Sequence, residues 1–320
     1  NAISNNNASN NGNYGIYLYS SSNYNTISNN NASNNSYGIY LYQICDHNTI
    51  SNNIANSNQN FGIAISTGSY NSINNNIALN NNANGLYLES SHDNIIDNNT
   101  ASNNTNYGIY LSSSSNNSIS NNTANNNVNY GGIALSSTSY YNNITNNIAN
   151  NNKDGISALS NSIIANNSVS NNANHGISLA GIGSIILDNN VSNSTLYNIY
   201  LASADNNLIQ DNILFNASHN LRLESSSSNQ IKNNIINFSS QFGIILYQSN
   251  DNNTIENNQI INSGSDGLYL SWSNQNTLRN NTIRLVSQNA VYLGSSSYNT
   301  IEDNAIENNT NAIQFLDSTN

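Results

Sequence analysis

The residues that could carry acid–base or metal chemistry are few in this chain. Among 320 residues, 16 are acidic, five are Lys or Arg, four are His and one is Cys. Asp46-His47 and His92-Asp93 fall at one corner of a repeat but two repeats apart, roughly 10 Å at the usual strand spacing, which is too far for one shared ion bound at about 2 Å. No nucleophile motif, phosphate loop or zinc spacing is present. We therefore expect no catalytic residue, no metal site and no cofactor, with an acid–base or metal site at that corner as the alternative.

Two further charged groups are candidates for catalysis. Arg222, Glu224 and His219 lie close together in one repeat, but they lack the neighbouring acids that a lyase or hydrolase needs. A second group alternates in sign at a spacing of 24, 23 and 23 residues: Lys232, Glu256, Arg279 and Glu302. Exposed ion pairs of this kind contribute about 0.2–1 kcal/mol each. Because the pattern neutralises itself, we interpret it as a stack of ion pairs rather than as a catalytic carboxylate between cations.

Tyrosines recur at one position of the repeat and form a predicted outward stripe. Its members are Tyr17, Tyr40, Tyr87, Tyr110, Tyr200, Tyr269 and Tyr292. Tyr offers a large apolar surface with a polar tip, so such a stripe could bind sugar rings or another protein. Stacked like side chains also stabilise a sheet without any ligand. We favour the stabilising role and retain the stripe as the best candidate for a binding surface.

These side chains must be positioned by a repeating backbone. A Gly-Ile-x-Leu-like tetrad occurs fourteen times at intervals of 21 to 24 residues. Ile16 and Leu18 alternate with Tyr17, which is typical of a strand with one buried face. Two more short apolar segments follow in each repeat. The sequence predicts an all-β parallel β-helix, a β-solenoid of about 14 coils of 21–25 residues with three short strands per coil, forming one domain over residues 1–320 with less regular coils at about 153–205.

An Asn recurs three residues after the inward Ile or Leu of the second strand. The predicted ladder comprises Asn6, Asn30, Asn53, Asn76, Asn99, Asn122, Asn147, Asn167, Asn190, Asn212, Asn234, Asn258, Asn281 and Asn304. Asn tolerates left-handed backbone, and its amide can bond to the equivalent amide one coil away. We expect an internal Asn ladder at a tight corner. We also expect the aromatics two residues before the tetrad Ile, such as Tyr14 and Tyr37, to pack over small alanines such as Ala32.

One repeat carries a family resemblance. Gly108-Ile109-Tyr110-Leu111, followed by Asn117-Ser118-Ile119-Ser120-Asn121-Asn122-Thr123-Ala124, resembles the parallel β-helix repeats of the NosD-like family, which are abundant in surface proteins of methanogenic archaea. The resemblance covers essentially the whole chain and implies a right-handed helix. That fold also hosts pectate lyases, polygalacturonases, epimerases and tail-spike hydrolases, so it does not fix an activity. With no Met and one Cys, the chain offers no soft copper site.

Composition limits the partners and the location. The net charge is -11 and five Lys or Arg cannot neutralise many phosphates, so we expect no nucleic-acid partner. No stretch approaches the roughly 20 apolar residues of a membrane helix. The chain begins within a repeat at Asn1, which favours a segment of a longer protein or a unit that stacks end to end. Asn193 and Asn216 head plausible glycosylation sequons at outer turns, and Cys45 is expected to be a buried, idle thiol or, alternatively, to form an intermolecular bond.

These observations favour a non-enzymatic extracellular protein at the cell surface. The expected role is a stiff surface-layer, sheath, stalk or fibre subunit, archaeal and glycosylated, that associates with itself, with other surface proteins or with glycans. The alternative is a carbohydrate-binding or polysaccharide-processing β-helix protein. It requires two or more outward acids on adjacent coils and loop insertions that wall a groove, and the near-constant coil length argues against such walls.

Overall fold

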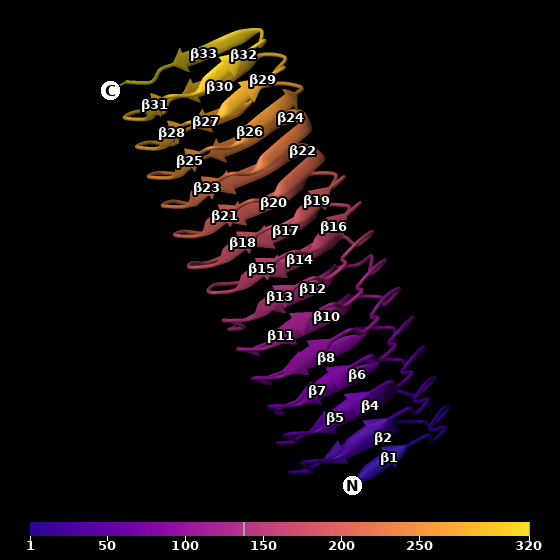
Figure 1. Ribbon diagram of the computed structural model, residues 1–320. Helices are drawn as coiled ribbons and strands as arrows, with labels where there is room; N and C mark the ends of the chain where they lie inside the picture. Colours follow the sequence, from indigo (N-terminus) through magenta and orange to yellow (C-terminus); the bar gives the residue numbers. More distant parts are fainter. Residues whose placement is uncertain (137, 320) are drawn as a thin grey trace. The chain divides into compact units, whose positions relative to one another are not determined.

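The computed structural model describes residues 1–136 and 138–319, in which strands alternate with turns and no helix occurs. The chain comprises two compact units, residues 1–163 and 164–320. Within each unit, every turn of the chain adds one strand to each of its parallel faces, in register with the turn before (Figure 1). The prediction of an all-β parallel solenoid of about 14 turns is confirmed. No described helix is long and apolar enough to cross a membrane.

In unit 1 the tetrad forms the longest strand of each turn. These strands are β2 (Tyr14–Tyr19), β4 (Tyr37–Tyr42), β6 (Ile63–Ser66), β8 (Leu86–Glu89), β10 (Tyr107–Ser112), β12 (Gly131–Ser136) and β14 (Asp154–Ala158). The register places like on like: Ile16 lies beside Ile39, and Leu18 beside Leu41. Ile39 and Leu41 are fully buried, which confirms the inward alternation.

The second face of unit 1 is built from three-residue strands. They are β1 (Ala2–Ser4), β3 (Thr26–Ser28), β5 (Thr49–Ser51), β7 (Ser72–Asn74), β9 (Ile95–Asp97), β11 (Ser118–Ser120), β13 (Asn143–Thr145) and β15 (Ile163–Ala165), which ends in unit 2. The third segment of each turn in unit 1 is reduced to a single parallel bridge, for example between Ile54 and Ile77. The predicted third strand is therefore shorter here than the pattern suggested.

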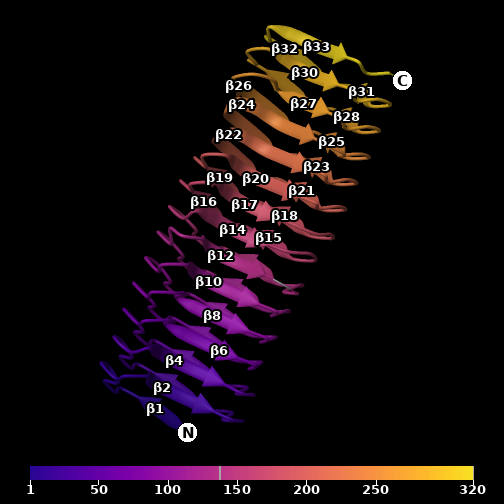
Figure 2. The same cartoon turned by 180° about the vertical axis from the view of Figure 1, so that it is seen from behind.

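Unit 2 repeats the plan with longer third strands. Its short face holds β18 (Ile185–Leu187), β21 (Leu208–Gln210), β23 (Gln230–Lys232), β25 (Thr254–Glu256), β28 (Thr277–Arg279) and β31 (Thr300–Glu302). The tetrad and third-segment strands are β16 (Ser168–Ser170), β17 (His175–Leu179), β19 (Asn190–Ser192), β20 (Tyr197–Ala202), β22 (Ile213–Glu224), β24 (Ile235–Tyr247), β26 (Gln259–Ser263), β27 (Leu268–Ser271), β29 (Thr282–Arg284), β30 (Asn289–Gly294), β32 (Ala305–Glu307) and β33 (Asn311–Leu316). In β22 and β24, a third segment runs straight into the next tetrad, giving the two long arrows of Figure 2.

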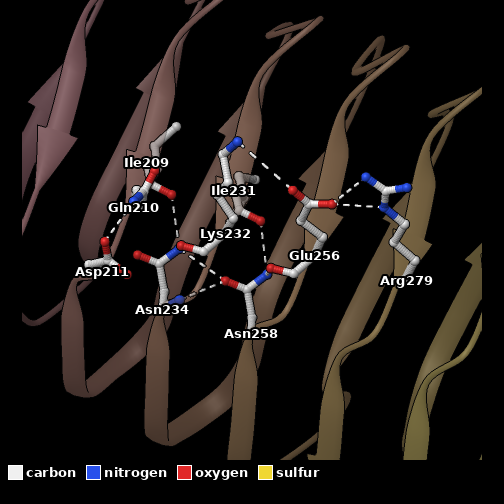
Figure 3. Close-up of polar contacts among 9 residues, drawn as sticks. All are labelled: Ile209, Gln210, Asp211, Ile231, Lys232, Asn234, Glu256, Asn258 and Arg279. Atoms are coloured by element: carbon white, nitrogen blue, oxygen red, sulfur yellow. Dashed lines mark hydrogen bonds and ion pairs between the residues drawn. The ribbon is translucent and has the colours of Figure 1, made fainter.

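A buried ladder of carboxamides follows the second face in each unit. In unit 1, Asn99 Nδ2 donates to Asn122 Oδ1 at 3.0 Å, and the Asn99 backbone N–H donates to the same oxygen at 2.9 Å. The Nδ2 of Asn122 also donates to the backbone carbonyl of Ile96 at 2.9 Å. Figure 3 shows the same pattern in unit 2, where Asn234 Nδ2 donates to Asn258 Oδ1 at 3.0 Å and to Ile209 O at 3.0 Å. The Asn ladder of the predicted fold is confirmed.

One member of the ladder was placed wrongly from the sequence. Asn167 Nδ2 donates to Asn189 Oδ1, and Asn189 Nδ2 donates to Asn212 Oδ1, each at 3.0 Å. Asn190 is instead exposed at the start of β19, where its backbone N–H pairs with Asn167 O. The buried position lies three residues after Ile186, so Asn189 occupies it and Asn190 does not.

Two further Asn ladders were missed. One precedes the second face, where Asn71 Nδ2 donates to Asn94 Oδ1 at 3.1 Å. The other follows the third segment, where Asn58 Nδ2 donates to Asn81 Oδ1 at 3.0 Å. All four of these amides are buried. The same 23-residue spacing was visible in the sequence, but the abundance of Asn hid it.

Left-handed backbone lies one residue before the ladder position, not on it. Asn98 and Asn121 have φ values of 53° and 56°, whereas Asn99 and Asn122 do not have positive φ. Asn is the non-Gly residue best suited to this region. Two adjacent asparagines therefore do different work: the first turns the chain, and the second points inward and bonds to the next turn.

The tetrad Gly leaves room for the third ladder. A Cβ on Gly38 would lie 2.4 Å from the Gly62 carbonyl oxygen and 2.8 Å from Asn58 Nδ2, and one on Gly85 would lie 2.7 Å from Asn104 Nδ2 and 2.8 Å from the Gly108 carbonyl oxygen. Because Gly has no Cβ, the Asn amide of the next turn can occupy the space beside it. It differs from the expected packing of aromatics over alanines, because those aromatics lie on the outer face, as described below.

The ladder predicts the effect of removing one amide. Replacing Asn122 with Ala leaves the buried Asn99 N–H without its acceptor, takes one donor from the Ile96 carbonyl and removes one of the two hydrogen bonds to Asn147 Oδ1. Since each buried orphan costs about 1–3 kcal/mol, Asn122→Ala is expected to lower the free energy of unfolding by about 3 kcal/mol or more. Urea denaturation measures the loss. Asn129→Ala, at an exposed Asn, is the matched control; an equal effect of both substitutions contradicts the ladder's role.

Candidate functional site

The outer face of the tetrad sheet in unit 1 carries a double column of aromatic rings. Tyr14 stacks on Tyr17 with centroids 4.3 Å apart and planes 10° apart. The Tyr17 and Tyr40 rings are 5.8 Å apart, and the Tyr87 and Tyr110 rings 5.7 Å apart. Ala64 takes the stripe position between Tyr40 and Tyr87, so the predicted stripe is interrupted there.

The second column of rings was assigned to the wrong side from sequence. Tyr107 lies two residues before the tetrad Ile, but its ring stacks on Tyr110 at 4.6 Å and on Tyr130 at 5.2 Å. Gly108 and Ile109 are both buried in β10, so strict alternation of inward and outward residues fails at Gly108. The spacing of the aromatic residues locates this position, but it does not reveal the break in alternation that turns the ring outward.

Several of these rings cover one another's faces. Two rings with nearly parallel planes and centroids under about 5 Å apart must overlap face to face, as offset stacking allows. Tyr107 on Tyr110 satisfies this, at 4.6 Å and 12°. Burial raises the pKa of Tyr40 and of Tyr87 to about 12 each. Ring edges and hydroxyls, rather than ring faces, are what such a stack offers to a partner.

Unit 2 has its own aromatic column, which includes two histidines. Its successive rings are His175, Tyr197, His219, Phe242, Tyr269 and Tyr292. Tyr269 and Tyr292, both predicted members of the stripe, stack at 4.9 Å with planes 7° apart. Tyr200 was also predicted, but its neighbour along the stripe is Arg222. Of the residues in this column, sequence reasoning identified only Tyr269 and Tyr292 as part of a stripe.

Arg222 is the centre of the charged cluster expected in unit 2. Its guanidinium lies 5.2 Å from the ring centroids of both Tyr197 and Tyr247, and it forms an ion pair of 2.9 Å with Glu224. Burial would raise the pKa of Glu224, but hydrogen bonds from Arg222 and Tyr200 reverse this and lower it. Burial and the bond to Glu224 raise the pKa of Tyr200 to about 12. The Glu224 carboxylate is therefore ionised and bound by Arg222 and Tyr200.

The other charged candidates also have structural partners. Asp46 Oδ1 accepts from the Ser69 N–H at 2.7 Å, and His92 Nδ1 accepts from the Ser115 N–H at 3.1 Å. His47 lies between the rings of Tyr24 and Tyr70 at 4.8 and 5.1 Å. Within residues 1–136 and 138–319, no three His, Cys, Asp or Glu residues are arranged to hold a metal ion.

The alternating charges also form ion pairs with residues of neighbouring turns. Glu256 lies 3.8 Å from Lys232 Nζ and 2.6 Å from an Arg279 nitrogen (Figure 3), and Glu302 is in register with Arg279.

Cys45 is fully buried, and burial raises its pKa. Its Sγ lies 3.4 Å from the Tyr42 carbonyl oxygen. A fully buried thiol does not favour the intermolecular bond.

One concave feature stands apart from the aromatic face. Two hollows of about 330 and 260 Å³ share Asn216 and Ser240 as lining residues; we call them together the corner groove. They follow the third segment of successive turns in unit 2, beside the expected sequons at Asn193 and Asn216. Asn216 Nδ2 donates to Asn193 Oδ1 at 2.8 Å, and both residues are exposed. Glycosylation of either residue remains a prediction, and a glycan there would stand at the groove.

The aromatic column predicts a pH dependence. Burial lowers the pKa of His219 to about 4, Arg222 adds to the effect, and Nδ1 has no partner. Between about pH 6.5 and pH 4, the unfolded chain binds a proton that the folded chain does not. As the pH is lowered from about 6.5 to about 4, the free energy of unfolding is therefore expected to decrease. The contribution of His219 to this decrease is up to about 3 kcal/mol.

Urea denaturation at several pH values measures this slope. His219→Phe, which keeps a ring in the column, is expected to flatten it. Tyr197→Phe changes the adjacent ring without removing a group that titrates in the window, and is expected to keep the wild-type slope. Equal slopes in wild type and His219→Phe contradict the assignment.

Solved structures share this architecture at low sequence identity. The pre-mature gene product 12 of bacteriophage phi29 matches with a TM-score of 0.63 and 13% identity, over 99% of this chain and 53% of that one. The E. coli bacteriophage HK620 tailspike mutant, in complex with pentasaccharide, gives 0.59 and 11% over 94% and 71%. PfbA, a surface adhesin of Streptococcus pneumoniae, gives 0.51 and 13% over 94% and 85%. This chain thus spans about half the length of the phi29 protein.

A search of curated protein sequences found no match. The model of the right-handed β-helix region matches residues 1–141, 71–191 and 175–320. These overlapping matches cover the whole chain, and the parallel register of both units agrees with them. The chain therefore belongs to the right-handed β-helix family.

Proposed function

We propose that this chain is a non-enzymatic structural element of an extracellular surface protein. The proposal is supported by one observation: the charged and polar side chains form hydrogen bonds and ion pairs with residues of neighbouring turns. Glu256 bridges Lys232 and Arg279, and buried Asp266 accepts two bonds from Asn289, at 2.8 and 2.9 Å. Groups engaged in this way stabilise the solenoid instead of meeting a substrate.

The geometry favours this role over hydrolysis or epimerisation. Glycoside hydrolysis typically uses two carboxyl groups about 5–9.5 Å apart that flank one bond. Here Glu224 is paired with Arg222, and Asp97 accepts from Ser120 and Asn121. Face-stacked tyrosines add to sheet stability at about 0.2–1 kcal/mol per cross-strand pair. The best-supported contribution of the stripe is therefore cohesion.

Glycan binding is the second candidate. The HK620 tailspike structure contains a pentasaccharide, and PfbA is described as a surface adhesin. Both likenesses concern the fold, so they support the candidate without assigning it. An extracellular location is part of the same proposal.

Activity assays test the proposal directly. The purified chain is expected to release no reducing ends and no unsaturated products from neutral or uronic-acid polysaccharides. Turnover above background that is lost on substitution of Glu224 or Glu256 by Gln, with an unchanged fold by circular dichroism, would overturn the structural role.

The stacked tyrosines provide a second test. Tyr269→Ser removes a ring that contacts both Phe242 and Tyr292, and is expected to lower the free energy of unfolding by about 1–2 kcal/mol. Tyr298→Ser, at an exposed Tyr for which no ring contact is described, should change it by less than about 0.5 kcal/mol. If both substitutions are neutral by urea denaturation, the stripe does not serve cohesion.

A further inference from the structure

We propose that the first corner of unit 1 binds an arginine side chain of a basic partner protein. This corner joins each tetrad strand to the second-face strand that follows it. The inference goes beyond the structural role, and it depends neither on that role nor on glycan binding. It rests on a column of exposed rings that stops beside a carboxylate.

One residue of each turn at this corner lies next to its equivalent in the following turn. In chain order these residues are Tyr24, His47, Tyr70, Asp93, Asn116 and Tyr141, which we call the corner column. Each immediately precedes an Asn of the buried ladder at this corner. The ladder therefore holds successive members of the column one turn apart, about 4.8 Å.

The first three members form a stack of parallel rings. The centroids of Tyr24 and His47 are 4.8 Å apart with planes 1° apart, and those of His47 and Tyr70 are 5.1 Å apart with planes 9° apart. Tyr24 and Tyr70 are 70% and 57% exposed, and His47 is also exposed. Rings stacked at the spacing of the turns lie across the solenoid axis, so each one directs a face toward the next turn.

The backbone does not require rings at this corner. At the second corner of unit 1, the residue before the ladder also has positive φ, and it is Asn in every described turn: Asn5, Asn29, Asn52, Asn75, Asn98, Asn121 and Asn146. Asn suits this conformation better than a bulky residue does. The exposed rings of the corner column therefore add a surface that the fold itself does not need.

The stack ends at Tyr70, because the next two members of the column have short side chains. We call Asp93 and Asn116 the ring gap; the column regains a ring at Tyr141, which is 61% exposed. His47 covers one face of Tyr70, and no second ring contacts Tyr70 among the residues that the structure describes. Since an Asp side chain is shorter than a Tyr side chain, the outer part of the other Tyr70 face is open at the level of Asp93.

The ring gap also contains polar groups that a ligand can reach. Asp93 is partly exposed and Asn116 is exposed. Within residues 1–136 and 138–319, neither side chain has a described hydrogen bond or ion pair. The adjacent His92 differs, because its Nδ1 accepts from the Ser115 N–H at 3.1 Å. The Asp93 carboxylate is thus an acceptor that the fold does not use.

The charge of unit 1 favours a cation at this carboxylate. Residues 1–163 contain one basic side chain, Lys153, and five acids: Asp46, Glu89, Asp93, Asp97 and Asp154. One minus five gives a formal charge of -4 with His neutral. Lys153 lies over the Tyr130 ring at 5.8 Å and directly precedes Asp154. The negative potential attracts a basic partner and repels an acidic one.

An aromatic face beside a carboxylate suits Arg better than Lys. A guanidinium is planar, stacks on an aromatic ring and donates two parallel N–H bonds to one carboxylate. At the level of Asp93, its face would lie on Tyr70 while its edge meets the carboxylate. Asn116, one turn further, offers an amide to the backbone of the bound segment. A Lys ammonium would gain the charge without the stacking.

Calorimetric titration of the full chain at about 50 mM salt, where screening is weak, tests the site. The probes are acetylated and amidated tetra-arginine, tetra-lysine and tetra-citrulline, the last being planar but neutral. Tetra-arginine is expected to bind in the millimolar range or tighter, at least about fivefold more tightly than tetra-lysine. Tetra-citrulline should bind more weakly than tetra-arginine.

Two variants locate the site. Tyr70→Asn and Asp93→Asn are each expected to weaken tetra-arginine binding by at least about fivefold. Both install the residue present at Asn116, so the fold should be kept, which circular dichroism checks. Tyr298→Asn removes an exposed Tyr of similar backbone conformation in unit 2, and Asp188→Asn removes an exposed acid there. These controls should change the Kd by less than about twofold.

Three results would overturn the assignment. If tetra-arginine does not bind, or binds no more tightly than tetra-lysine, the corner has no site for a guanidinium. If Tyr70→Asn and Asp93→Asn keep the wild-type Kd, binding occurs elsewhere. Sugar rings also stack on tyrosine, so cellohexaose is titrated in parallel. If it binds, loses affinity in Tyr70→Asn and displaces tetra-arginine, the corner is a glycan site instead.

Discussion

The structure depends on one interaction: a buried carboxamide that bonds to the equivalent carboxamide of the next turn. An Asn side chain provides a donor and an acceptor on one rigid group, so it can pass the bond onward indefinitely. Here it also accepts the neighbouring backbone N–H, as Asn122 does from Asn99. Each turn is thereby held in register, and a one-residue slip would leave several buried groups unpaired. The aliphatic columns and outer rings stack because this register is fixed.

The third ladder also shows how the packing of one corner changes along the chain. In unit 1 its amides lie beside a tetrad Gly, whereas in unit 2 the amide of Asn220, at the tetrad position, donates to Ser239 Oγ. Where Gly243 and Ser263 are small at both positions, a Cβ on Gly243 would lie 2.5 Å from Ile260 Cγ2, so the larger third-segment side chain fills the space. The extra residue in β24 and the strained Phe238 act at the same corner.

Much of this was predictable from the sequence because the repeat is so regular. Spacing alone located the tetrads, the inward Ile column and most of the ladder. The errors are informative. Asn190 was chosen over Asn189 because two adjacent asparagines follow Asp188 and only geometry separates them. Tyr107 was assigned inward because alternation breaks at Gly108. The packing at the third ladder required knowing which residues face each other across a corner, and spacing along the chain does not reveal that when Asn occurs everywhere.

The central claim concerns the backbone N–H groups that donate to side-chain oxygens of the ladder, such as those of Asn30, Asn53, Asn76 and Asn99. Amide hydrogen exchange of the native chain, resolved by residue, measures them directly. If the carboxamides bond as described, these N–H groups exchange as slowly as the strand amides beside them. Exchange at the rate of an unprotected peptide would contradict the account.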